Sequence, residues 1–327
     1  TWLSILLGTL VAGPGCAGDF QDNAEVAVFI DEMVDKHKFK REELVLLFDQ
    51  ARKRDDILEA ISRPAEKTKP WHEYRKIFLQ PARIGGGAEF WKENADILQR
   101  AADEYGVDPA IIVAIIGVET RYGSNTGSYR VIDALSTLAF EYPPRSKFFR
   151  SELEQFLLLA REEDVDRSSA KGSYAGAMGY GQFIPSSYRA YAVDFSKDGK
   201  RDLWNNLDDI IGSVANYFHR HGWVQGTPVA ALISSGSPLA HFQISENLKP
   251  GETKAGDYAA RGVTTNPALP ADMPASLLKL EQADAPEFWL TGKNFYVITR
   301  YNRSPLYAMA VYQLSEAIRD AYQKTAQ

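Results

Sequence analysis

The stretch EYGVDPAIIVAIIGVETRYG, from Glu104 to Gly123, predicts the helix that decides the fold class. Asp108 is a favourable N-cap residue, and Pro109 suits the first helical position. The residues that follow are apolar on most sides, so we expect this helix to be buried among others. Helical patterns also cover residues 23–63, 88–105, 146–163, 186–193, 208–221 and 305–323, with a loop at 84–87. The sequence therefore predicts a mainly α-helical core.

Glu119 lies at the end of this apolar helix. The residues three, four and seven positions before it share its face, and they are Ile116, Ile115 and Ile112. A carboxyl group in such a wall loses water, which favours its neutral form and is expected to raise its pKa. This property suits a general acid near neutral pH. The alternative is a helix-end glutamate that points to solvent or pairs with Arg121.

Glycine and tyrosine alternate in a second segment, KGSYAGAMGYGQFIPSSY, from Lys171 to Tyr188. Glycine permits backbone conformations that are closed to other residues and allows a ligand to approach closely. Tyrosine offers a flat apolar face with a polar tip. Together these residues suit the wall of a sugar-binding groove, and the alternative is a flexible surface loop.

Two motifs, ETRYG at Glu119–Gly123 and GAMGYGQFIPSSY at Gly176–Tyr188, resemble the lysozyme-like lytic murein transglycosylases, and most of all the membrane-bound lytic transglycosylase B family. Further segments that resemble this family begin at Ile57 (ILEAISRPAEKTKPWHEYRKIF), Val131 and Asn294 (NFYVITRYNRSPLYAMAVYQL). Matches in this order, spread over nearly the whole chain after about Asp22, are specific, whereas ETRYG alone would not be.

The resemblance implies a lysozyme-like helical core with an N-terminal helical domain and a small inserted β-rich domain. We expect a signal or anchor segment at 1–21, the N-terminal helical domain at 22–90 and the catalytic core at 91–223. Glycine and proline recur between 224 and 300, and the short runs VAALIS and FYVITRY are typical of strands, which predicts the β-rich domain there. Residues 301–327 are expected to form a helix that returns to the core.

Composition and charge narrow the class of protein. With 45% hydrophobic and 24% charged residues, the chain is ordinary for a globular protein. The net charge is −6, and the sequence has no basic block interleaved with aromatic residues, which argues against nucleic acid as a partner. The apolar run from Trp2 to Ala12 is too short to span a bilayer and fits the core of a signal peptide.

Cys16 is the single cysteine, so no internal disulfide can form. Its position just after the apolar run resembles a bacterial lipoprotein cleavage site, and cleavage near Ala17 or Gly18 is the second possibility. Both cleavage possibilities predict export to the periplasm, either as a soluble protein or as an outer-membrane lipoprotein that is anchored in the membrane only through its lipid. The alternative is a buried N-terminal helix of the mature fold.

The segment that begins at Asp194 resembles the start of an EF-hand loop, with oxygen ligands at positions one, three and five and glycine at six. Its candidate ligands are Asp194, Ser196, Asp198 and Lys200. Asn205 stands where the bidentate glutamate belongs, and the resemblance implies a longer loop closed by Asp209, or by Asp208 if the register shifts by one. We expect a structural Ca²⁺ and no organic cofactor, and an ordinary Asp-Gly turn is the alternative.

The resemblance also implies the residues of a glycan groove. Aromatic faces pack on sugar rings, Gln182 can hold an amide or hydroxyl, and Arg145 can meet a peptide-stem or lactyl carboxylate. Ser173 aligns with a position near the reacting N-acetyl group. The implied groove residues are Tyr74, Arg145, Ser173, Tyr180, Gln182, Tyr217, Tyr301 and Tyr307. Taken singly, each tyrosine has the alternative of a half-buried packing residue.

The implied activity is that of a lytic transglycosylase, which cleaves the β-1,4 bond between N-acetylmuramic acid and N-acetylglucosamine and leaves 1,6-anhydromuramoyl ends. Glu119 is its expected acid and base, and the N-acetyl group or oxocarbenium character of the substrate replaces the usual second carboxylate. The alternatives are a lysozyme-type hydrolase and a non-catalytic murein-binding scaffold. The expected partners are peptidoglycan strands and, as a second class, other cell-wall enzymes.

Overall fold

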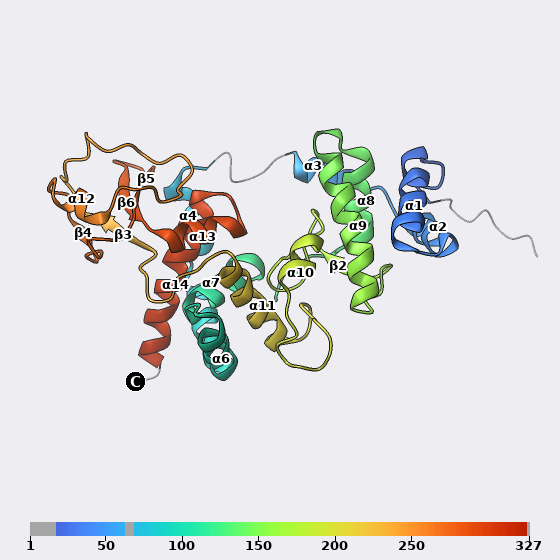
Figure 1. Ribbon diagram of the computed structural model, residues 1–327, viewed down its shortest axis with the longest axis horizontal. Coiled ribbons are helices and arrows are strands. Elements are labelled where there is room, and N and C mark those ends of the chain that lie inside the picture. Colours follow the sequence, from blue (N-terminus) through green and yellow to red (C-terminus); the bar gives the residue numbers. More distant parts are fainter. Residues whose placement is uncertain (1–17, 63–68, 326–327) are drawn as a thin grey trace, which may run out of the picture.

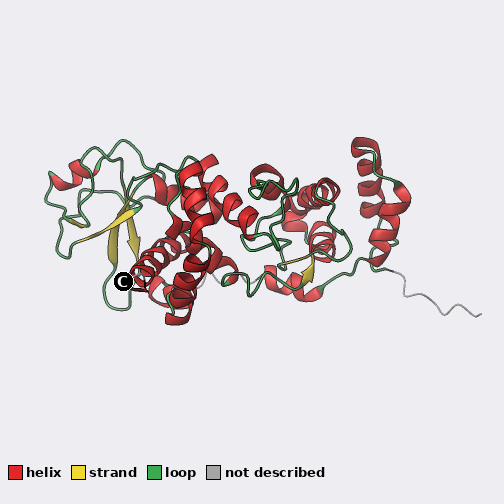
Figure 2. Cartoon of the chain, turned by 90° about the horizontal axis from the view of Figure 1, so that it is seen from below, coloured by secondary structure: helices red, strands yellow, loops and turns green. Residues whose placement is uncertain are grey.

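The computed structural model describes residues 18–62 and 69–325 and shows an elongated molecule (Figure 1). Helices dominate, and a small sheet lies at one end (Figure 2). Cys16 and the apolar run before it lie outside the described residues. Within the described part of the chain, no helix is both long and apolar enough to cross a membrane.

One group of helices forms the half of the molecule that lies away from the sheet. Helix α3 packs on α8, and α8 packs along α9. His37 of α1 lies 2.7 Å from Glu154 of α9, which ties the first helices to this group. Its helices are α1 (Ala24–His37), α2 (Arg41–Gln50), α3 (Asp55–Ile61), α8 (Val131–Glu141), η2 (Pro143–Arg145), α9 (Ser146–Glu162) and α10 (Pro185–Tyr191).

A second group surrounds α7 (Pro109–Thr120) at the centre of the molecule. Ten of the twelve residues of α7 are buried, which explains why its sequence is apolar on every side. Helix α14 lies along α7 as the expected returning helix, and α4 and α5 pack on α14. The domain boundaries given above stay predictions. The other helices of this group are α4 (Trp71–Phe78), α5 (Pro81–Glu93), α6 (Ala95–Tyr105), α11 (Leu207–Arg220), α13 (Lys293–Tyr301) and α14 (Pro305–Thr325).

The β-rich part holds a four-stranded antiparallel sheet in the order β4-β3-β6-β5. Leu278 pairs with Trp289 in the register of β5 and β6. This part has its own small apolar core, which includes Ile233, Tyr258 and Leu290. A separate two-stranded ribbon pairs β1 (Tyr129–Arg130) with β2 (Lys171–Gly172). The remaining elements are β3 (Ala230–Ile233), α12 (Ala255–Ala259), β4 (Thr265–Asn266), β5 (Ser276–Leu280) and β6 (Glu287–Thr291).

Two local predictions are wrong. FYVITRY forms helix α13 and not a strand, because its buried residues, among them Phe295, Ile298 and Thr299, follow a helical period. The expected loop at 84–87 lies inside α5. Gly87 is needed there for close packing, since a Cβ at this position would lie 2.5 Å from the Tyr122 hydroxyl and 2.6 Å from Ile318 Cδ1.

Candidate active site and metal loop

Glu119 lies half-buried in the last turn of α7. The helix ends directly after it, because Arg121 and Tyr122 take left-handed φ values of 51° and 59°. This conformation is strained for residues other than glycine and persists only where the surroundings hold it. The Tyr122 hydroxyl donates to the carbonyl of Arg83 at 2.8 Å, which supplies such a hold. Glu119 therefore sits on a fixed helix end.

Tyr307, in the first turn of α14, contacts this carboxyl group directly. Its hydroxyl donates a hydrogen bond to Glu119 Oε1 at 2.5 Å. Desolvation raises the pKa of Tyr307 well above its usual value, and the charge of Glu119 raises it further. The phenol therefore stays protonated at neutral pH and stabilises the carboxylate form of Glu119 as a donor.

Tyr301, at the end of α13, belongs to the same cluster. Burial raises its pKa, and the charge of Glu119 adds to this effect. Its hydroxyl donates to the carbonyl of Gly181 at 2.5 Å, so it ties α13 to the glycine-rich segment. The ring of Tyr301 lies 4.7 Å from that of Tyr217, whose hydroxyl donates to the Arg300 carbonyl at 2.6 Å.

Tyr74 of α4 completes the cluster. Its side chain is buried, and it lies close enough to Tyr307 to contribute to the raised pKa of that residue. The structure thus gathers predicted residues that are far apart in the sequence. They are Tyr74, Glu119, Tyr217, Tyr301 and Tyr307.

The glycine-rich segment packs against the end of α7. Gly123 has a φ of 85°, and a Cβ there would lie 2.0 Å from Cζ of Tyr180, so only glycine admits this ring. The side-chain amide of Gln182 donates to the carbonyls of Gly179 at 2.9 Å and Thr126 at 3.1 Å. Tyr180 therefore packs against the turn that follows Glu119, and Gln182 is held beside the same turn through Thr126.

Arg145 and Ser173 have other contacts in the structure. Arg145 is exposed, and its guanidinium lies 4.4 Å from the ring centroid of Phe148. The Ser173 hydroxyl accepts hydrogen bonds from the backbone amides of Ala175 at 3.3 Å and Ala177 at 3.1 Å, which shapes a turn. Their roles in a groove stay predictions.

Thr120 and Gly181 were not predicted from the sequence, although both contact predicted site residues. The Thr120 hydroxyl lies 3.0 Å from the Tyr180 carbonyl and accepts a hydrogen bond from the Gly123 amide at 3.0 Å. Gly181 supplies the carbonyl that holds Tyr301. Their positions in the sequence could have identified them. Thr120 follows Glu119 in the ETRYG motif, and Gly181 lies between Tyr180 and Gln182 in the second motif.

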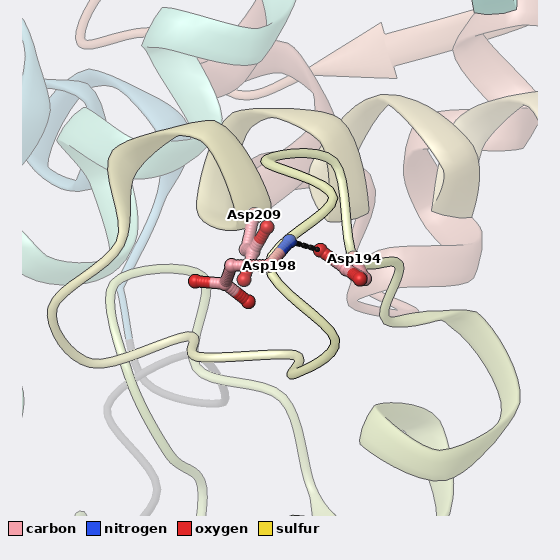
Figure 3. Close-up of side chains that lie close together, drawn as sticks. All are labelled: Asp194, Asp198 and Asp209. Atoms are coloured by element: carbon pink, nitrogen blue, oxygen red, sulfur yellow. Dashed lines mark hydrogen bonds between the residues drawn. The ribbon is translucent and has the colours of Figure 1, made fainter.

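Asp194, Asp198 and Asp209 come together in a loop away from this cluster, with one carboxylate oxygen of each within 4.8 Å of the others (Figure 3). Asp194 Oδ1 accepts the Asp198 amide at 3.0 Å, and its Oδ2 accepts the Gly199 amide at 2.8 Å. Desolvation is the largest single effect and acts to raise the pKa of Asp194, but the hydrogen bonds from the backbone amides, together with the Ser196 hydroxyl, outweigh it and lower this pKa. The donor set, three carboxylates and no nitrogen or sulfur, fits a hard cation such as Ca²⁺.

Asp209 is fully buried in the first turn of α11. Its Oδ1 accepts the amides of Phe195 at 2.8 Å and Ser196 at 3.0 Å, and its Oδ2 accepts the amide of Asp202 at 2.9 Å. Asp208, the alternative closing residue, instead forms an ion pair with Arg100 of α6. The structure therefore places Asp209 with the loop.

The two weaker candidates lie at the edge of this loop. The Ser196 hydroxyl lies 3.3 Å from Asp194 Oδ1. The Lys200 amide donates to Asp198 Oδ1 at 3.0 Å, and its ammonium group lies 3.7 Å from Asp164. Only the backbone carbonyl of Lys200 has the chemistry of a calcium ligand, since its ammonium group is a donor alone.

Comparisons with known proteins identify the family of this chain. Residues 21–316 match the family model described as the transglycosylase SLT domain. Membrane-bound lytic murein transglycosylase B of Escherichia coli is 46% identical over 310 residues, which cover 92% of this chain and 84% of that protein.

Solved structures show the same fold. The soluble lytic transglycosylase SltB1 of Pseudomonas aeruginosa is 52% identical, with a TM-score of 0.83 over 91% of this chain and 99% of that chain. Escherichia coli Slt35, solved in complex with calcium, is 46% identical, with a TM-score of 0.85 over 94% and 96%. Pseudomonas aeruginosa SltB3, in complex with NAG-anhNAM-pentapeptide, is 33% identical, with a TM-score of 0.81 over 90% and 78%.

The family model spans most of the chain, and the relatives are similar over nearly all of its length. The predicted lysozyme-like fold is confirmed. The chain belongs to the lytic murein transglycosylases of the SLT family, which are lyases that act on peptidoglycan.

Proposed function

We propose that Glu119 is the single acid and base with which this lytic transglycosylase cleaves peptidoglycan. The observation that carries the proposal is the hydrogen bond from buried Tyr307 to Glu119 Oε1 inside a cluster of tyrosines. In the first step, Glu119 gives its proton to the glycosidic oxygen while the bond from that oxygen to C1 of the muramoyl unit breaks. Tyr307 stabilises the carboxylate that this step leaves.

In the second step, the Glu119 carboxylate removes the proton from the O6 hydroxyl of the same sugar, and O6 bonds to C1. The enzyme returns to its starting protonation state, and no water is consumed. The attacking hydroxyl is tethered to the reacting ring, which gives it a high effective concentration if the ring is held correctly. We assign the task of holding the ring to Tyr180, Gln182, Tyr301 and Tyr307. In this proposal Tyr74 and Tyr217 support these side chains, and Ser173 and Arg145 contact the glycan strand further from the cleaved bond.

Product chemistry tests this mechanism against hydrolysis. We expect muropeptides that end in 1,6-anhydromuramic acid and carry no label when the reaction runs in ¹⁸O water. Mass spectrometry of digested sacculi measures both properties. Reducing ends that carry the label would show a lysozyme-type hydrolase and would remove the proposed role of Glu119 in the second step.

We also propose that Asp194, Asp198 and Asp209 hold a structural Ca²⁺. The support comes from the three clustered carboxylates of this chain and from Slt35, which has been solved in complex with calcium. The ion would join the loop at Asp194 to the start of α11. No step of the reaction needs it. Isothermal titration with calcium, repeated after Asp198→Ala, tests the site.

For localisation we propose export to the periplasm, with Cys16 as the candidate lipid attachment point. The apolar run before Cys16 and the membrane-bound relative support this proposal. Peptidoglycan strands are the proposed partners, and other cell-wall enzymes stay a prediction. Mass spectrometry of the mature N-terminus after expression with its natural leader distinguishes an acylated Cys16 from simple cleavage.

A further inference from the structure

Helices α7 and α14 lie side by side (Figure 1). They run in opposite directions, because the start of α14 contacts the end of α7 and the last turns of α14 contact its start. Two polar contacts join them at opposite ends. At one end Tyr307 donates to Glu119, and at the other Arg319 Nη2 donates to Asp108 Oδ2 at 2.6 Å. Asp108 and Glu119 are eleven residues apart, and Tyr307 and Arg319 are twelve. At about 1.5 Å per residue the two separations along the helix axes are nearly equal, so the two contacts lie at matching positions on the paired helices.

Asp108 fixes the second contact to the backbone of α7. Its Oδ1 accepts the Ala110 amide at 2.9 Å, and its Oδ2 accepts Arg319. One carboxylate therefore caps α7 and holds α14 at the same time. Glu316, one turn earlier on α14, lies 3.5 Å from the same guanidinium nitrogen and helps to direct it.

The surroundings of this ion pair are open. A cavity of about 490 Å³ is bordered by Asp108, Glu316 and Arg319 and by Trp223 after α11. Between the two polar contacts the buried residues of α14 are apolar apart from Ser315, and they include Val311, Leu314 and Ile318. Apolar packing is non-directional, whereas a hydrogen bond of 2.5 Å at Glu119 tolerates little change in distance or angle. The ion pair thus supplies a directional contact beside this cavity, at the far end of the helix pair.

We propose that Arg319 is a positioning residue: through Asp108 it sets the axial position of α14 against α7, and with it the contact between Tyr307 and Glu119. The inference rests on the proposed catalytic role of Glu119. It assigns a function to a residue at the far end of α14 that does not touch the reacting atoms. A displacement of about 1 Å near reacting groups costs up to about 10²-fold in rate, so a smaller shift has a measurable effect.

The test uses a soluble, uncrosslinked glycan strand of alternating N-acetylglucosamine and N-acetylmuramic acid. Arg319→Gln should lower kcat about tenfold with KM unchanged, and Arg319→Lys should restore most of the loss. In a Tyr307→Phe background, Arg319→Gln should lower kcat no further, because Arg319 acts through that hydroxyl.

Arg189→Gln is the matched control. Arg189 pairs with Glu162 at 2.6 Å, and these side chains are 28% and 36% exposed, against 30% and 37% for Arg319 and Asp108. Because this pair lies between α9 and α10, its loss should leave kcat unchanged. Equal losses from Arg319→Gln in the wild-type and Tyr307→Phe backgrounds would show a general structural role and overturn the proposal, and so would an unchanged kcat.

If Arg319→Gln does not fold, Asp108→Asn takes its place, because asparagine keeps the helix cap while the charge is lost. Glu119→Gln, measured in parallel, separates the two proposals. Full activity of Glu119→Gln would remove the proposed function. An inactive Glu119→Gln together with wild-type behaviour of every Arg319 and Asp108 variant would remove the positioning role alone.

Discussion

Glu119 and Asp209 are both carboxylates at helix ends, but their surroundings differ. Asp209 lies in the first turn of α11, where the helix dipole favours an anion, and it accepts three backbone amides. Glu119 lies in the last turn of α7, where the dipole disfavours an anion, and it accepts the hydroxyl of Tyr307. The backbone amides stabilise a carboxylate that stays ionised, as at Asp209. The side-chain donor on another helix stabilises a carboxylate that gains and loses its proton during the proposed reaction, as at Glu119.

The two carboxylates, although chemically similar, are held by different parts of the structure and suit different tasks. The loop around Asp209 is built from neighbouring amides, so its geometry follows from local backbone structure. The site at Glu119 is built from α4, α7, α13 and α14, so its geometry depends on how distant helices pack. Changes at Glu119 should therefore affect the reaction, and changes at the loop should affect stability.

Replacing the proton donor gives the largest expected effect. Glu119→Gln keeps the shape of the side chain but removes the titrating proton, so we expect kcat to fall by about 10²–10⁴-fold. Melting temperature and binding to sacculi should stay as in the wild type. Glu154→Gln, which changes a carboxylate that pairs with His37 on the far helices, is the control. Near wild-type turnover by Glu119→Gln would contradict the proposed role of Glu119 as acid and base.

Removing the side-chain donor gives the next largest effect. Tyr307→Phe deletes the hydroxyl that reaches Glu119 Oε1. A hydrogen bond to a charged group contributes about 1.5–3 kcal/mol, so kcat should fall by about 10- to 100-fold. Steady-state kinetics on a defined glycan strand measure kcat and KM of the Tyr307→Phe variant and of the wild type. A loss confined to KM would show that Tyr307 binds the sugar without acting on Glu119.

The helix that carries Glu119 was predictable because its signals are local. The Asp108 cap, the proline after it and the apolar run all lie within one segment. The contact with Tyr307 was not predictable from the residues, since it joins positions 188 apart in the sequence. The family resemblance named both residues but gave no hydrogen bond between them.

The wrong predictions have the same physical origin. The glycines of α5 suggest a loop by propensity, yet tertiary contacts with Tyr122 and Ile318 make a helix with no side chain at Gly87 the better solution. The β-branched residues of FYVITRY suggest a strand, yet packing on α14 selects a helix. At the metal loop, Asp209 was the expected closing residue and Asp208 its alternative if the register shifts by one, and the direction of each side chain on α11 separates them.

Calcium should act on stability and leave the chemistry alone. At about 100 times its Kd, a ligand that binds only the folded state stabilises by about 2.7 kcal/mol, which corresponds to a rise in melting temperature of roughly 4 °C for a chain of this size. Asp198→Ala should abolish this rise, and its activity at low temperature should match the wild type. Differential scanning calorimetry with calcium and with chelator measures the shift. An equal rise in both proteins would place the ion elsewhere.

The smallest expected effect is a pH dependence of the free energy of unfolding, and it comes from His221 beside the tyrosine cluster around Glu119. His221 stacks on Tyr217 with ring centroids 4.1 Å apart, and burial, with smaller contributions from Arg300 and Arg220, lowers its pKa below the usual 6.5. The unfolded chain then binds a proton more readily than the folded one, so stability is complete above pH 6.5 and falls as the pH drops below it. We expect the melting temperature to fall more between pH 7.5 and pH 5.5, about one unit to either side of the usual pKa, in the wild type than in His221→Gln. Equal falls would show that other groups carry the pH dependence and that the aromatic cluster tolerates a charged His221.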